Sequence, residues 1–123
     1  MTQPAPPKLV LVVEDEDNIA AALEFIVERE GLRHHRVADG DQALGAIRAM
    51  RPDTVLLDVM LPGASGFDIC QDVRKDPDLR HVRIIMMTAR GSAQQQSRCI
   101  EAGADDFIPK PFDLQSLRTL LRA

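Results

Sequence analysis

The 123-residue chain has no Trp or Tyr, and its four Phe make up only 3% of the residues. No segment approaches the roughly 18 consecutive apolar residues of a membrane span, and the opening MTQPAPPK lacks the apolar stretch of a signal peptide. The formal net charge of -4 argues against a broad nucleic-acid-binding surface, which would need clustered Lys and Arg. We therefore expect a cytoplasmic protein that binds neither membrane nor nucleic acid directly.

There are only two cysteines, Cys70 and Cys99, and they lack the CxxC spacing of redox and metal sites. Both lie in amphipathic helical patterns, so we expect reduced residues in or beside the core. The length fits one domain with a core of its own. Three of the first seven residues are Pro, which predicts a disordered lead over residues 1–7 ahead of a single domain over residues 8–123.

Apolar strand-like segments alternate strictly with amphipathic helical ones. Strands are expected at residues 8–13, 34–38, 54–58, 83–88 and 106–108. Helices are expected from 18 to a stop at Gly31, over 41–50, from 67 to a stop at Asp76, over 93–102 and over 114–121. This order predicts an α/β fold: a single (βα)5 domain with a doubly wound, parallel five-stranded sheet covered by helices on both faces.

Polar side chains mark the carboxyl ends of four of these strands. Glu14 and Asp15 follow the first, Asp58 ends the third, Thr88 ends the fourth, and Lys110 follows the fifth. Ligands of such sheets bind outside the carboxyl ends of the strands, near the point where the strand order reverses. Neighbouring strands lie about 4.8 Å apart, so these groups are predicted to converge on one small ligand. For Asp58 alone, a solvated strand end would be an equally good interpretation, because turns favour Asp.

Three carboxylates at that spacing would repel by up to about 4 kcal/mol per pair at an effective dielectric near 20, so they need a cation or raised pKa values. Oxygen ligands without His or Cys favour Mg²⁺. The lysine and the hydroxyl would donate to phosphate oxygens, as phosphoryl transfer requires, and Asp58 would be a nucleophile that forms an acyl phosphate. The alternative is an acidic cluster that binds no cation.

Four segments, in this order and spacing, carry a resemblance to a known family: LVVEDE, LLDVMLPGASGFD, IIMMTA and AGADDFIPKPF. Over about residues 8–122 the sequence resembles the receiver domains of two-component response regulators, a chemotaxis-regulator-like family with a flavodoxin-like fold. The resemblance implies a switched module of a phosphorelay that takes phosphate from a sensor histidine kinase or a histidine phosphotransfer protein. It would act on a downstream output domain or protein. Its only catalysis would be its own Mg²⁺-dependent phosphorylation and slow autodephosphorylation.

The resemblance also implies roles for the metal-site residues. Asp58 would accept the phosphoryl group and share in binding Mg²⁺. Asp15 would bind the metal directly, Glu14 through a water molecule, and Met60 through its backbone carbonyl. Glu14 stands where the family often has Asp, which puts only the metal affinity in question.

Further roles concern the phosphoryl group and the switch. Thr88 and Lys110 would contact the phosphoryl group, Thr88 and Phe107 would form the switch, and the Lys110–Pro111 peptide bond would be cis. Phe107 lacks the hydroxyl of the common Tyr, so a switch here would rest on packing. Ala64 and Ser65 replace a frequent Met-Asp, which changes the loop surface but not the phosphorylation chemistry.

Two alternatives to a phosphorylation switch stay open. The first is a phosphatase of the haloacid-dehalogenase type, although that class has a second acid two residues after the nucleophile, where this chain has Met60, and it needs room for a cap. The second is an adaptor that binds partners without phosphorylation.

The surface charges lead to two further expectations. The charged residues 28–30 are interpreted as the solvent-facing side of a helix. On the last helix Ser116 stands where a charged dimer partner would be expected. We therefore expect a chain that is mainly monomeric when unphosphorylated and that does not form the ion-pair dimer of related receivers.

Overall fold

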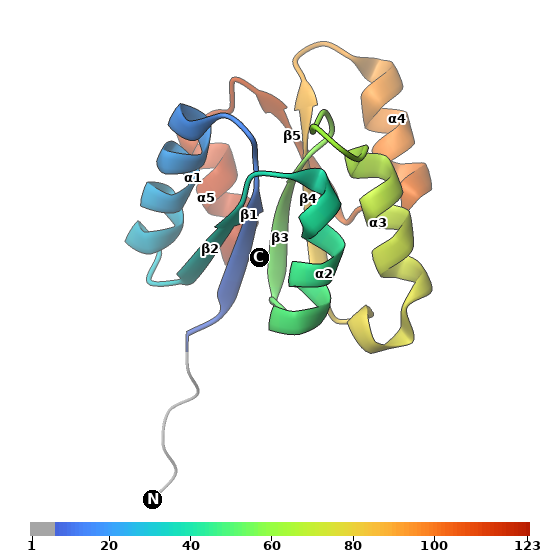
Figure 1. Ribbon diagram of the computed structural model, residues 1–123. Coiled ribbons are helices and arrows are strands. Elements are labelled where there is room, and N and C mark those ends of the chain that lie inside the picture. Colours follow the sequence, from blue (N-terminus) through green and yellow to red (C-terminus); the bar gives the residue numbers. More distant parts are fainter. Residues whose placement is uncertain (1–6) are drawn as a thin grey trace, which may run out of the picture.

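The computed structural model describes residues 7–123, so all of the expected lead except Pro7 lies outside the described residues. Five strands alternate with five helices and one short 3-10 helix (Figure 1). The strands are β1 (Leu9–Val13), β2 (Arg33–Val37), β3 (Thr54–Asp58), β4 (Arg83–Ala89) and β5 (Asp106–Lys110). The helices are α1 (Asp17–Arg29), α2 (Gly40–Met50), α3 (Gly66–Lys75), η1 (Pro77–Leu79), α4 (Ala93–Ala102) and α5 (Leu114–Arg122).

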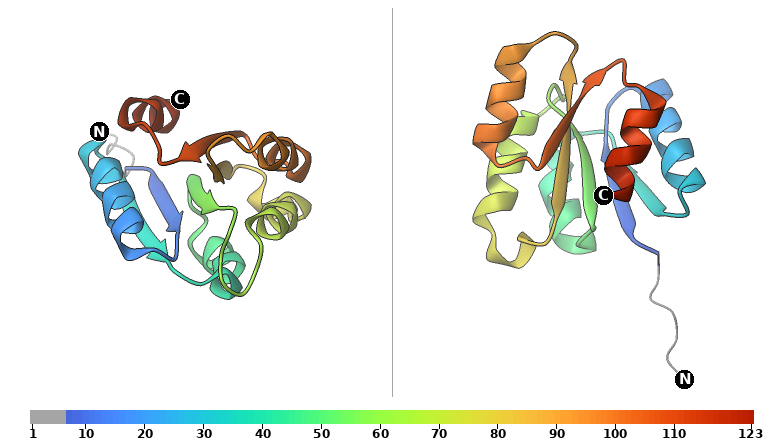
Figure 2. Two further views of the ribbon diagram at one scale, coloured as in Figure 1. Left: turned by 90° about the horizontal axis from the view of Figure 1, so that it is seen from above. Right: turned by 180° about the vertical axis from the view of Figure 1, so that it is seen from behind.

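The strands form one parallel sheet in the order β2-β1-β3-β4-β5. Helices α1 and α5 cover one face, and α2, α3 and α4 cover the other (Figure 2). The predicted doubly wound α/β fold is confirmed. The strand order reverses between β1 and β3, which puts the switch point at the ends of the two central strands that carry the predicted acids. No helix in residues 7–123 is long and apolar enough to cross a membrane.

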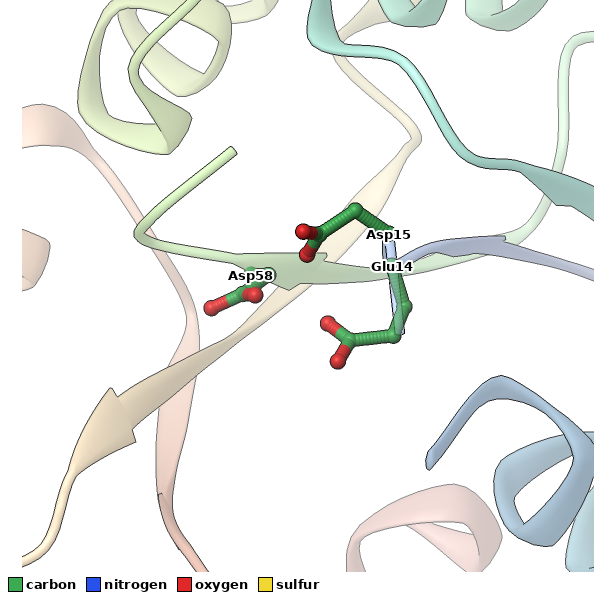
Figure 3. A group of neighbouring side chains, drawn as sticks. All are labelled: Glu14, Asp15 and Asp58. Atoms are coloured by element: carbon green, nitrogen blue, oxygen red, sulfur yellow. The ribbon is translucent and has the colours of Figure 1, made fainter. Parts of the chain in front are cut away.

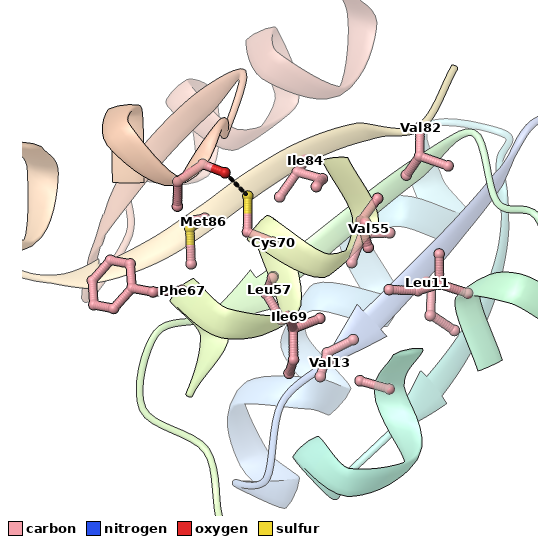
Figure 4. Packing of buried hydrophobic residues seen from close by; sticks show 14 of the residues in the cluster. Leu11, Val13, Val55, Leu57, Phe67, Ile69, Cys70, Val82, Ile84 and Met86 are labelled. Atoms are coloured by element: carbon pink, nitrogen blue, oxygen red, sulfur yellow. Dashed lines mark hydrogen bonds between the residues drawn. The ribbon is translucent and has the colours of Figure 1, made fainter. Parts of the chain in front are cut away.

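Strand alternation divides the interior into two apolar clusters. On β1, Leu11 and Val13 pack in the cluster under α2, α3 and α4, which Figure 4 shows, whereas Val10 and Val12 pack in the cluster under α1 and α5. Both faces of the sheet are covered, which explains why the central strands are continuously apolar. Both cysteines are buried and free, as expected, and Cys70 Sγ donates to the Ala102 carbonyl at 3.4 Å.

The fourth and fifth strands extend further than the sequence indicated. The register pairs Thr88 with Pro109 and Ala89 with Lys110, so β4 includes Ala89 and β5 runs on through Pro109. A proline is tolerated there because β5 is an edge strand. As a result Lys110 is the last residue of a strand and not the first residue of a loop.

The prediction that residues 28–30 face solvent is wrong for Glu30. Its side chain is only 11% exposed, and Oε1 lies 3.2 Å from Arg118 Nε and 2.9 Å from Arg122 Nε. The hydrogen bond from Arg122 is the main cause that lowers the Glu30 pKa. These ion pairs join the C-terminal ends of α1 and α5, which the sequence could not show because the partners are about 90 positions apart.

Gly66, the first residue of α3, has no room for a side chain. A Cβ there would lie 2.2 Å from the backbone oxygen of Asp58, and the Gly66 N–H donates to the Val59 carbonyl at 3.0 Å. We expect Gly66→Ala to lower the free energy of unfolding by about 1–3 kcal/mol, because the strand end that carries Asp58 must move.

The matched control is Gly45→Ala, in the middle of α2, where an added Cβ meets nothing within 4 Å. That change should raise stability by roughly 0.5–1 kcal/mol, because Ala loses less backbone entropy than Gly on folding. Urea denaturation measures both variants. Equal stability of Gly66→Ala and the wild type would contradict the packing argument.

Candidate functional site

Three acids meet at the carboxyl edge of the two central strands. Glu14 and Asp15 come directly after β1, and Asp58 is the last residue of β3, the neighbouring strand. Carboxylate oxygens of the three lie within 4.8 Å of one another (Figure 3). Glu14 is fully buried and Asp58 is 5% exposed, whereas Asp15 is exposed. The predicted convergence of these acids is therefore found.

Lys110 joins this group from the far edge of the sheet. Its Nζ lies 2.9 and 3.0 Å from the two carboxylate oxygens of Glu14 and 2.9 Å from Asp58 Oδ2. Lys110 is two residues after Ile108, which packs under α1 and α5, so alternation puts its side chain on that same face. The ammonium group therefore reaches past the end of β4 to bind both buried acids.

Burial and the neighbouring Asp58 raise the pKa of Glu14 to about 7, although Lys110 opposes the shift. The Lys110 pKa is also raised, but for a different reason. Burial lowers it, and the hydrogen bonds with Glu14 and Asp58 more than offset that effect. One ammonium group cannot neutralise three carboxylates at this spacing, so the site favours a further cation. An all-oxygen donor set of this kind fits Mg²⁺.

The backbone of the acidic segment is held by Arg36, near the end of β2. Its Nε donates to the Glu14 carbonyl and its Nη2 to the Asp15 carbonyl, both at 3.1 Å, while Nη1 lies 2.8 Å from Asp17 Oδ1. The Glu14 N–H also donates to the Val37 carbonyl at 3.1 Å. Sequence reasoning missed Arg36. The signal was a basic residue in the second strand, whose importance depends on the pairing of β2 with β1.

The loop after β3 folds back on Asp58. The Met60 N–H donates to Asp58 Oδ1 at 3.2 Å, which leaves Oδ2 to Lys110. Met60 as a whole is 72% exposed. Beside it an open hollow of about 620 Å³ is lined by Asp15, residues 59–65, Phe67 and Arg98. A metal-binding role for the Met60 carbonyl stays a prediction.

Thr88 lies outside the Lys110 network. It follows Ile84 and Met86 on β4 at even spacing, and those two residues pack under α2, α3 and α4. Its side chain is fully buried, and its Oγ1 has no hydrogen-bond partner among residues 7–123. Phe107 is half-buried, packs against the same cluster, and pairs with Met86 across the β4–β5 ladder. A buried hydroxyl without a partner is costly and calls for an explanation.

The connections after β4 and β5 are tied together. Arg90 is exposed, and its Nη2 donates to the Pro111 carbonyl at 2.7 Å. The preceding Lys110–Pro111 peptide bond is cis, as the family resemblance implied. Arg90 thus binds the segment that carries Lys110.

Comparison with known protein families identifies the family to which the chain belongs. The family model described as the response regulator receiver domain matches residues 10–122, nearly the whole chain. The chain belongs to this family. This receiver domain resembles the DNA-binding response regulator MtrA of Mycobacterium tuberculosis (strain H37Rv), with 42% identity over 114 residues. These residues are 93% of this chain but 49% of MtrA.

A second relative is the phosphate regulon transcriptional regulatory protein PhoB of Rhizobium meliloti (strain 1021), with 38% identity over 117 residues that make up 95% of this chain and 51% of that protein. The receiver domain thus spans about half the length of the curated relatives that it matches.

Solved structures agree with the family assignment. A response regulator from Chloroflexus aurantiacus J-10-fl superposes with a TM-score of 0.91 at 36% identity, covering 94% of this chain and 95% of that one. The receiver domain of sensor histidine kinase PA1611 from Pseudomonas aeruginosa PAO1 gives a TM-score of 0.86 at 31% identity, with the same coverage. A magnesium ion is coordinated in the active-site cleft of that structure.

The raised pKa of Glu14 predicts how stability depends on pH. Its ordinary value is 4.5 and its value in the fold is about 7, so the folded chain holds this proton more tightly than the unfolded chain. The resulting stabilisation is fully present below pH 4.5 and is lost as the pH rises through 7. In EDTA, we expect wild type to lose on the order of 2 kcal/mol more than Glu14→Gln between pH 5 and 8. Urea denaturation across that range measures the difference, and parallel curves would contradict it.

Proposed function

We propose that this receiver domain accepts a phosphoryl group on Asp58 from a partner histidine kinase or histidine phosphotransfer protein, in an Mg²⁺-dependent reaction. The observation that carries the proposal is the Asp58 carboxylate itself. It ends a central strand at the switch point, lies 2.9 Å from the Lys110 ammonium, and is within 4.8 Å of two further carboxylates.

The residues of the site would have different roles in binding Mg²⁺. Asp15, Asp58 and the Met60 carbonyl would hold Mg²⁺, with Glu14 acting through water. When bound, Mg²⁺ would neutralise negative charge on the phosphoryl oxygens. This division agrees with the surroundings of the two neighbouring acids, because the exposed Asp15 is free to bind a metal while the buried Glu14 already accepts two hydrogen bonds from Lys110.

In the transfer step an Asp58 oxygen attacks the phosphorus of the donor's phosphohistidine. The new O–P bond forms as the N–P bond breaks, and the leaving imidazole takes the electron pair and a proton. The Met60 N–H orients the Asp58 carboxylate through Oδ1. Lys110, which both acids hold at the site, then donates to a phosphoryl oxygen, and Thr88 donates its hydroxyl to another.

Phosphorylation of Asp58 would also change the conformation of the switch residues Thr88 and Phe107. Phosphorylation exchanges one negative charge at Asp58 for roughly two and adds acceptor oxygens. Thr88 has a buried hydroxyl without a partner in residues 7–123, so it gains a hydrogen bond by turning toward them. Phe107, packed on the same face as Thr88, then moves toward burial and changes the face that partners bind. With no hydroxyl on Phe107, this change rests on packing.

The two alternatives are weaker. A haloacid-dehalogenase-type phosphatase is not favoured by a receiver-domain match over residues 10–122, and Met60 stands where that class has its second acid. An adaptor without phosphorylation would not need a lysine held between two buried acids. Because MtrA and PhoB are about twice as long as this chain, the output is a proposal too: a downstream domain or protein, without DNA binding by the residues described here.

We expect acetyl phosphate and Mg²⁺ to add one phosphoryl group to the wild type, because Asp58 is the nucleophile. Asp58→Asn and treatment with EDTA should both abolish labelling, whereas Asp68→Asn, an exposed acid on α3, should label normally. Intact-mass spectrometry reads the result. Undiminished labelling of Asp58→Asn would contradict the proposal, and repeated turnover of a phosphomonoester would favour the phosphatase.

The ion pairs of Glu30 support a monomer. Arg118 and Arg122 are the basic residues of α5, and both bind Glu30 within the same chain, which withdraws them from an ion-pair dimer. We expect a monomer at micromolar concentration, and any association induced by beryllofluoride should depend little on salt. Glu30→Gln weakens this internal pairing and should make association more sensitive to salt. Sedimentation at low and high salt tests both, and a wild-type dimer that dissociates on adding salt would refute the expectation.

A further inference from the structure

A closed ring of hydrogen bonds joins the end of β4 to the first turn of α4. Ser92 precedes the helix, and its Oγ accepts from the Gln95 N–H at 3.2 Å. The Ser92 N–H donates to the Ala89 carbonyl at 3.2 Å. The Ala89 N–H in turn donates to Gln95 Oε1 at 2.7 Å, which closes the ring.

This ring departs from the usual way of capping a helix. The sequence from Ser92 to Gln95 has the S-x-x-Q pattern of a capping box, in which the glutamine side chain accepts from the backbone N–H of the cap residue. Here Gln95 bypasses Ser92 and reaches three residues further back, to Ala89. The Gln95 side-chain oxygen therefore binds a backbone N–H at the end of β4 and not one at the N-terminus of α4.

The N–H that Gln95 holds belongs to the peptide unit between Thr88 and Ala89. A peptide unit is planar, so fixing its N–H also fixes the bond that leads back to the Cα of Thr88. Thr88 is the residue with the buried hydroxyl that lacks a partner in residues 7–123. Ala89 also lies in register with Lys110, the cation of the site. The ring thus restrains the backbone next to both predicted phosphoryl contacts.

We propose that Gln95 is a positioning residue of the receiver: its side-chain oxygen holds the Thr88–Ala89 peptide, sets where the Thr88 hydroxyl stands, and passes a shift of that peptide to the first turn of α4. The inference rests on the proposed phosphorylation of Asp58. Gln95 itself touches neither the acids nor Lys110 by any hydrogen bond found in residues 7–123 and acts through the backbone alone.

Three consecutive glutamines allow a matched experiment. Gln95→Leu removes the acceptor, Gln95→Glu keeps one, and Gln94→Leu changes an exposed neighbour with no side-chain hydrogen bond found in residues 7–123. The rate of labelling by acetyl phosphate with Mg²⁺ is measured for each variant. NMR follows the Thr88 methyl group and the amides of residues 93–96 with and without beryllofluoride. Urea denaturation determines the folded fraction by which each rate is corrected.

We expect Gln95→Leu to label about 3- to 10-fold more slowly, the change that corresponds to one hydrogen bond. Its Thr88 methyl signal should shift, and the amides of residues 93–96 should no longer respond to beryllofluoride. Gln95→Glu and Gln94→Leu should match the wild type in all three respects, which a general loss of stability would not produce.

Wild-type labelling by Gln95→Leu with an unchanged Thr88 methyl signal would overturn the inference, as would equal effects in Gln94→Leu. A wild type that takes no label at all would overturn the proposed function instead. The positioning role would then still be decided without phosphate, by whether Gln95→Leu shifts the Thr88 methyl signal.

Discussion

The ammonium group of Lys110 makes the acidic edge of this sheet possible. Glu14 and Asp58 are almost completely buried, and carboxylates this close would repel strongly without a cation between them. Lys110 supplies that cation from 96 and 52 positions away in the sequence. It can do so only because β5 pairs with β4 through Lys110, so that the strand carries the side chain to the face where both acids lie. The order of the strands, the register of β5 and the charge of the site thus depend on one another.

The two faces of the sheet carry different parts of the predicted machinery. Glu14, Asp58 and Lys110 lie on the side of α1 and α5, while Thr88 and Phe107 lie on the side of α2, α3 and α4. A change at Asp58 therefore cannot reach Phe107 through side-chain contact on one face alone. In the proposed switch it would cross at the strand ends, through the Thr88 hydroxyl and the β4 backbone that carries it. On the proposed role of Gln95, the hydrogen bonds that hold the end of β4 would therefore contribute to the switch alongside the groups that bind the ligand.

Some parts of the protein could be predicted from the sequence more completely than others. The alternation of apolar and amphipathic segments was enough for the fold, and β3 and α4 have the predicted bounds, because buried strands and capped helices leave local signals. The convergence of Glu14, Asp15, Asp58 and Lys110 followed from the rule for parallel sheets, although their chemical roles stay predictions. Arg36, Glu30 and Gln95 were missed, since each acts through a partner that only the folded chain brings near. For Gln95 the S-x-x-Q pattern was visible, but it pointed to the Ser92 N–H as the donor to the glutamine side chain, whereas the donor is the Ala89 N–H.

The connection from β4 to α4 is held from two sides. Gln95 binds it at the N–H of Ala89, and Arg90 binds the Pro111 carbonyl in the segment that follows Lys110. These two hydrogen bonds involve the neighbouring residues Ala89 and Arg90 but connect them to different elements. The first connects to α4, and the second to the segment between β5 and α5. A shift of Thr88 would strain the hydrogen bond of Gln95, and a shift of Lys110 would strain that of Arg90. Since both residues are predicted to contact the same phosphoryl group, a single charge at Asp58 would strain both hydrogen bonds together, and α4 and the start of α5 would respond as one surface.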